Sequence, residues 1–127
     1  MPLNTPQFDI TEGRIAFVIK AGQVIWSDNQ PKVLVKLSKD ANFISLVKDE
    51  NNQLVFTHFS VEYGQTILSV DAKDLPSNRD LPFILSWSVP NKKIGLYVNG
   101  TLKKEETIPM GVGFEIPKGY KVKLIKN

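Results

Sequence analysis

Carboxylate side chains are the natural starting point, because hydrolysis of a glycosidic bond needs two of them placed across the scissile bond. In this sequence the acids fall in predicted turns or at strand ends rather than along one strand face. They include Asp28, Asp40, Asp49, Glu50, Asp74, Asp80, Glu105 and Glu106. Glu105 and Glu106 are adjacent, so strand alternation would point them to opposite faces. We therefore predict no catalytic residue.

Other reactive groups are scarce. The chain has no cysteine, which excludes a thiolate nucleophile, a disulfide framework and any cysteine-based metal site. Its single histidine, His58, shares the strand phase of Leu54 and Phe56, so we expect it at the rim of the core. No serine stands in a recognisable nucleophile elbow. These counts favour a protein without covalent chemistry.

Calcium is the one cofactor that the residue types leave open. Carboxylate and amide oxygens suit this ion, and several lie in predicted loops: Asp28, Asp40, Asp49, Asn51 and Asn52. Their spacing matches no known calcium loop, and an acidic hairpin tip is usually only solvated. We expect no cofactor and no metal site.

Aromatic residues beside amides and carboxylates are the pattern that a saccharide site would need. One predicted loop holds Trp26, Asp28 and Asn29 together, and Tyr63 and Tyr97 are the other aromatic candidates. Each has a structural alternative: Trp26 could cap the end of the fold, Tyr63 could pack beside its glycine, and Tyr97 could cover neighbouring strands. The loop from Trp26 to Asn29 is the favoured ligand-binding candidate.

Charge is unevenly distributed over the 127 residues, whose formal net charge is +3. Residues 117–127 hold Lys118, Lys121, Lys123 and Lys126 without any acid, so the rest of the chain is nearly neutral. A nucleic-acid-binding domain would usually carry a basic face. We therefore expect no nucleic-acid partner. The alternation across Lys121–Ile125 instead predicts an edge strand with its lysines in solvent.

The length suits one globular domain over residues 1–127, with a core of its own. No run approaches the roughly 18 apolar residues of a membrane span, so we expect no membrane partner. Met1–Thr11 has neither a basic leader nor an apolar segment, and we expect no signal peptide there. The compartment and the oligomeric state stay open at this level.

The hydrophobic pattern has a period of two, which is typical of half-buried β-strands. Alternating runs separated by turn residues are Gly13–Ile19, Lys32–Leu37, Phe43–Lys48, Gln53–Ser60, Thr66–Asp71, Phe83–Val89, Ile94–Val98, Thr101–Glu106 and Lys121–Ile125. Asn99-Gly100 is a strong type I′ hairpin signal, and 72–81 should cross between two sheets. These features predict an all-β fold: an antiparallel two-sheet β-sandwich.

The order of these features resembles the concanavalin A-like lectin/glucanase superfamily and its laminin-G-like domains. The residues that carry the resemblance are WSVPNKKIGLYVNG at Trp87–Gly100 and the Phe43–Phe56 hairpin, within a match over about residues 13–106. The resemblance implies a concanavalin-like jelly roll, and it includes no catalytic or ligand motif.

Two packed sheets require inward-facing residues and leave Thr57, Ser86, Ser88 and Tyr97 facing outward. The predicted core is Ile15, Phe17, Ile19, Val33, Val35, Leu46, Leu54, Phe56, Leu68, Val70, Phe83, Leu85, Trp87, Ile94, Leu96 and Val98. We interpret the chain as a non-catalytic, lectin-like module for an oligo- or polysaccharide. A structural or protein-interaction domain is the alternative, and a glycoside hydrolase-like enzyme is third.

Overall fold

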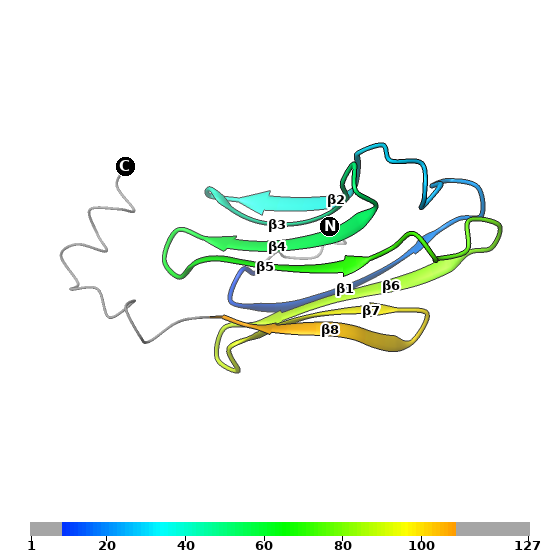
Figure 1. Cartoon of the computed structure of the whole chain (residues 1–127). Helices are drawn as coiled ribbons and strands as arrows, with labels where there is room; N and C mark the ends of the chain where they lie inside the picture. The colour runs from blue at the N-terminus through cyan, green and yellow to red at the C-terminus, as the bar shows by residue number, and fades with distance from the viewer. Residues whose placement is uncertain (1–8, 109–127) are drawn as a thin grey trace, which may run out of the picture.

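The computed structural model describes residues 9–108, which form eight strands in two antiparallel sheets that pack as layers (Figure 1). Sheet I has the order β1-β6-β7-β8 and comprises β1 (Glu12–Ile19), β6 (Leu81–Ser88), β7 (Lys93–Val98) and β8 (Thr101–Thr107). Sheet II has the order β2-β3-β4-β5 and comprises β2 (Lys32–Lys39), β3 (Asn42–Lys48), β4 (Gln53–Ser60) and β5 (Gly64–Asp71). The strand predicted at Lys121–Ile125 lies outside the described residues.

The predicted all-β sandwich is confirmed, and each predicted strand within residues 9–108 is present to within about two residues at its ends. The segment 72–80 crosses from sheet II to sheet I as predicted. Asn99 and Gly100 adopt φ angles of 54° and 83°, as a type I′ turn between β7 and β8 requires. No helix in this part of the chain is long and apolar enough to span a membrane.

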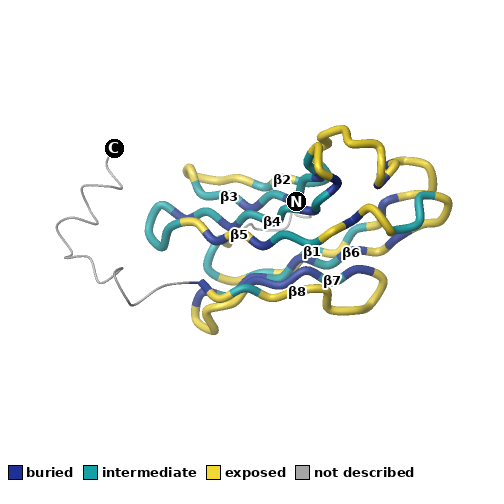
Figure 2. The backbone as a smooth tube through the Cα atoms, in the orientation of Figure 1, coloured by how far each residue is buried: buried dark blue, intermediate teal, exposed yellow. Residues whose placement is uncertain are grey.

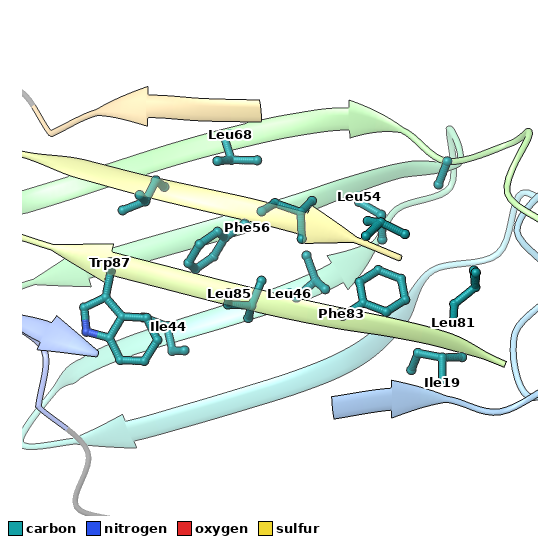
Figure 3. Close-up of a cluster of buried hydrophobic side chains, with 14 of the residues drawn as sticks. Ile19, Ile44, Leu46, Leu54, Phe56, Leu68, Leu81, Phe83, Leu85 and Trp87 are labelled. Atoms are coloured by element: carbon teal, nitrogen blue, oxygen red, sulfur yellow. The ribbon is translucent and has the colours of Figure 1, made fainter. Parts of the chain in front are cut away.

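The core lies between the two sheets, where buried and partly buried positions alternate along the central strands (Figure 2). Large side chains from the two inner faces meet there, as the close-up of the cluster shows (Figure 3). Those from sheet I include Phe83, Leu85 and Trp87, and those from sheet II include Leu46 and Phe56. This alternation places the intervening residues of every strand on an outer face.

Some predicted core positions differ from the structure. Val33 was expected inside but is 64% exposed, because the β2–β3 register shifts between Val33 and Val35 and turns its side chain outward. Ile15 and Phe17 are only partly buried, since β1 is an edge strand with no neighbour on one side. The alternating pattern predicts the face of a residue, whereas a bulge or an edge position changes its burial.

The segment Asp9–Thr11 forms a strap that joins the two sheets at one end of the sandwich. The indole of Trp87 in sheet I donates a 2.7 Å hydrogen bond to the carbonyl of Asp9. The imidazole Nε2 of His58 in sheet II lies 2.8 Å from the carbonyl oxygen of Ile10. Because a carbonyl only accepts, Nε2 must carry the proton.

The buried position of His58 makes this strap sensitive to acid. Burial lowers the pKa of the imidazole below its ordinary value of 6.5, and the bond to Ile10 opposes the shift without cancelling it. The Nδ1 atom of His58 and the hydroxyl of Thr66, its cross-strand partner, are buried without a hydrogen bond. The imidazole is therefore held on the Nε2 side only.

Replacing Gly100 with valine should destabilise the domain by at least about 1 kcal/mol, because the β-branched side chain would be forced to a positive φ. Urea unfolding of Gly100→Val measures the loss. Thr101→Val, at the exposed neighbouring strand position, is the control and should change stability little. An unchanged midpoint for Gly100→Val would contradict the turn described above.

Stability should fall as the pH drops below about 6.5. The folded pKa of His58 lies below its unfolded value, so the unfolded chain takes up the proton first and acid favours unfolding. Urea titrations between pH 5 and pH 8 measure the slope. The variant His58→Gln, which keeps an N–H donor but does not titrate, should flatten it. Equal slopes for the two proteins would contradict this role of His58.

Candidate functional site

Trp26, the favoured aromatic candidate, is a plug at one end of the sandwich rather than an open platform. Its side chain is 1% exposed and its ring packs at a centroid distance of 5.8 Å from the ring of Phe83. The indole N–H donates a 3.1 Å hydrogen bond to the carbonyl of Pro76, and the backbone N–H of Trp26 bonds the hydroxyl of Ser77. No face of this indole is free for a sugar, so the structural alternative describes its position.

Asp28 is engaged by a buried lysine. The Lys48 side chain is 1% exposed, and its ammonium group lies 2.6 Å from the carboxylate of Asp28. The ammonium also donates to the carbonyl of Gln30 and to the amide oxygen of Asn52. All three protons of Lys48 thus have acceptors, which is what a buried cation requires. The bond from Lys48, followed by one from the Gln30 backbone, holds the pKa of Asp28 below its ordinary value.

Asn29 completes this internal network. It adopts a φ of 59°, which directs its backbone N–H to the amide oxygen of Asn52 at 2.8 Å. Its side-chain amide donates to the carbonyl of Glu50 in the β3–β4 hairpin. Asp28 and Asn29 therefore fasten the loop between β1 and β2 to that hairpin. Their polar groups have partners within the fold.

Tyr63 lies at the opposite end of sheet II from this network. Its backbone N–H bonds the hydroxyl of Ser60 at the end of β4, whereas Lys48 and Asn52 flank the other end of β3 and β4. The structure does not bring Tyr63 beside Trp26. Among residues 9–108, no group of three His, Cys, Asp or Glu side chains is arranged to hold a metal ion.

Tyr97, the remaining candidate, lies on the outer face of sheet I beside a solvent-open hollow of about 430 Å³. The hollow is lined by Glu12, Gly13, Arg14, Ser86, Trp87, Ser88, Asn91, Lys93 and Glu105. It therefore spans the whole width of the sheet, from β1 to β8. None of the residues singled out for ligand binding lines this hollow, and Tyr97 lies in the next row of the same sheet face.

Cross-strand register explains why polar groups gather there. Two neighbouring rows run across the outer face of sheet I. The first row is Glu12–Ser88–Lys93–Thr107, and the second is Arg14–Ser86–Gly95–Glu105. The next row holds Tyr97 between Ile84 and Leu102. Ser86 and Ser88 thus lie in neighbouring rows on β6, with charged residues on β1, β7 and β8 to either side, and the row of Tyr97 follows along the same face.

Gly95 lies beneath the side chains of the second polar row. It is buried in the middle of β7, and a Cβ atom built there would be 3.1 Å from the hydroxyl oxygen of Ser86, 3.6 Å from Cδ1 of Leu102 and 3.7 Å from Cγ of Glu105. Because the glycine has no side chain, its neighbours can close over the strand. A larger residue at this position would displace the Ser86 hydroxyl group.

The charges in the hollow are only partly satisfied within the protein. Lys93 and Glu105 form an exposed ion pair at 3.9 Å, and the hydroxyl of Ser88 donates to the Glu12 carboxylate at 3.3 Å. The side chain of Arg14 makes neither a hydrogen bond nor an ion pair within residues 9–108. The site therefore offers hydroxyl groups, a carboxylate and a free guanidinium to a polar ligand.

Sequence reasoning identified the outward-facing Ser86, Ser88 and Tyr97 but missed Arg14 and Gly95. Strand phase already places Arg14 opposite the inward-facing Ile15. What the local pattern does not contain is the pairing of β1 with β6 and of β6 with β7, which brings Arg14, Ser86 and Gly95 into one row.

Comparison with known proteins supports the fold and leaves the family open. No protein-family model matches the chain, and no curated protein matches it. Solved structures do match the chain. Domains LG4-5 of the mouse laminin alpha1 chain match at 14% identity and a TM-score of 0.58, and the match covers 80% of this chain and 25% of that one. The binding domain of botulinum neurotoxin serotype D matches at 16% identity and a TM-score of 0.59, covering 81% and 27%.

A third match is the CBM40 module of the Ruminococcus gnavus IT-sialidase, at 14% identity and a TM-score of 0.56, covering 77% of this chain and 54% of that one. The same module is also known bound to α2,3- and to α2,6-sialyllactose. The chain thus spans from about a quarter to about half the length of these structures. At such identities the likeness shows the jelly-roll sandwich, which confirms the predicted resemblance.

Truncation of the Trp26 plug should cost about 3–5 kcal/mol of stability, because Trp26→Ala leaves a large cavity at the end of the core. Urea unfolding measures this loss. Ile25→Ala, at the neighbouring side chain that is 47% exposed, is the matched control and should change stability by about 0.5 kcal/mol or less. Similar losses for the two variants would contradict the plug.

Proposed function

We propose that the domain is a non-catalytic module that binds an oligosaccharide in the hollow on the outer face of sheet I. The observation that carries the proposal is the hollow itself, which Ser86 and Ser88 line and which has Tyr97 in the neighbouring row of the same face. A pyranose ring presents C–H groups on its faces and hydroxyl groups at its edge. A tyrosine ring and a row of serines are complementary to those two features.

The positions of the polar groups suit hydroxyl recognition. Ser86 and Ser88 lie two residues apart on β6, so their hydroxyl groups point to the same face about 7 Å from one another. The Ser86 hydroxyl can donate one hydrogen bond and accept others, and the Ser88 hydroxyl, which donates to Glu12, can accept from a ligand. The amide of Asn91 and the charged groups of the two rows add further partners around the hollow.

The acids of the hollow support binding rather than hydrolysis. Glu12 on β1 and Glu105 on β8 are the carboxylates that line it, and three strand spacings separate their strands, which is about 14 Å. Glycosidases place their two carboxylates about 5–10 Å apart. Glu105 is also paired with Lys93. A glycoside hydrolase-like activity therefore has no suitable pair in this hollow.

The solved structures of this fold give the proposal further support. The comparison includes a module bound to sialyllactose and the binding domain of a toxin. These are binding domains, which agrees with a role without chemistry for this chain. A structural or protein-interaction role is the alternative, and it predicts that the hollow takes no sugar.

Displacing the Ser86 hydroxyl group should weaken saccharide binding while leaving the fold intact. A glycan array with the wild-type domain comes first, followed by calorimetric titration of the best oligosaccharide. Gly95→Ala should weaken binding at least about tenfold, because its methyl group would lie 3.1 Å from the Ser86 hydroxyl oxygen and push it from its place in the hollow. Tyr97→Ala should weaken it by a similar factor, because it removes the stacking surface.

Thr57→Ala is the matched control, since Thr57 faces outward on the other sheet, and it should bind like the wild type. Circular dichroism and thermal melts should show that all three variants fold. A blank array with the folded wild type would overturn the proposal and leave the structural or protein-interaction role. Undiminished binding by Gly95→Ala would show that the sugar binds elsewhere.

A further inference from the structure

The hollow on sheet I contains more charge than the recognition of a neutral sugar requires. Four ionisable side chains line it: Glu12 and Arg14 on β1, Lys93 on β7 and Glu105 on β8. Three of them have partners inside the protein, through the Lys93–Glu105 ion pair and the Ser88–Glu12 hydrogen bond. Arg14 has none within the described residues.

From this we infer that the ligand carries a carboxylate and that Arg14 binds it, which makes this arginine the residue that selects an acidic saccharide. The inference rests on the proposed function and adds the ligand's charge. A guanidinium presents paired N–H donors in a plane, and this geometry matches the two oxygens of a carboxylate. A neutral sugar would leave the positive charge of Arg14 without a counterion.

The register places this guanidinium where it can act together with the rest of the hollow. Arg14 pairs with Ser86 across β1 and β6, and both residues line the hollow. A sugar ring that hydrogen-bonds Ser86 would direct a substituent along this row toward β1. A carboxylate on that substituent would then meet the guanidinium.

The negative charge of Glu12 gives the inference a second test, because this carboxylate repels an anionic ligand. Glu12 lies two residues before Arg14 on the same outer face of β1, and no ion pair joins the two side chains. Glu12 repels a carboxylate bound nearby, and this repulsion weakens with added salt. Removal of the Glu12 charge should therefore strengthen binding of an acidic saccharide, whereas removal of the Arg14 charge should weaken it.

The test measures the affinity for two sugars that differ only in the acidic residue, lactose and 3′-sialyllactose. A second measurement uses an array of paired glycans with and without a terminal uronic or sialic acid. The wild type should prefer the acidic member of the pairs, and sialyllactose over lactose by at least about tenfold. Arg14→Gln should remove this preference, so that the variant binds sialyllactose no more tightly than lactose. Glu12→Gln, which keeps an acceptor for Ser88, should raise the affinity for sialyllactose.

Lys103→Gln is the matched control, since it removes one positive charge from an exposed position of β8 that does not line the hollow. It should leave the preference unchanged. Equal binding of acidic and neutral pairs by the wild type would overturn the inference and leave the proposed function standing. An Arg14→Gln variant that keeps the wild-type preference would overturn it as well. A blank array would instead overturn the proposed function itself.

Discussion

The burial of one face of each sheet against the other determines where every other group of this domain can lie. Phe83, Leu85 and Trp87 of β6 pack against side chains of sheet II, including Leu46 and Phe56. Because side chains alternate along a strand, this packing forces the residues between them to the outer face. The composition of the candidate site is therefore a consequence of the core.

The ends of the sandwich present a second physical demand, since loops and strand ends leave polar groups near an apolar interior. Three polar side chains meet this demand by hydrogen bonds within the fold. Lys48 fastens one loop to a hairpin, the Trp26 indole bonds the carbonyl of Pro76, and His58 bonds the strap at the other end through Nε2. These side chains serve the fold. The outer face of sheet I instead exposes the guanidinium of Arg14, which has no partner within residues 9–108.

Local sequence was sufficient to predict the strands, the Asn99-Gly100 turn and the inward position of Trp87, because each depends on alternation or on turn chemistry. It failed at Val33, where a shift in register with β3 reverses the side chain. It also favoured Trp26 as a ligand platform, although the indole is buried by contacts with residues about fifty positions away. Arg14, Ser86 and Gly95 form one row only through pairing of distant strands, and no local pattern encodes that pairing.

The central claim is that a saccharide binds on the outer face of sheet I, and a two-dimensional amide NMR titration tests it most directly. Addition of an oligosaccharide identified on an array should shift the backbone amides of residues in the hollow rows, with Ser86, Gly95 and Tyr97 moving together along one binding curve. Amides of the loop with Asp28 and Asn29 should not move. Shifts confined to that loop, or spread over the outer face of sheet II, would contradict the account.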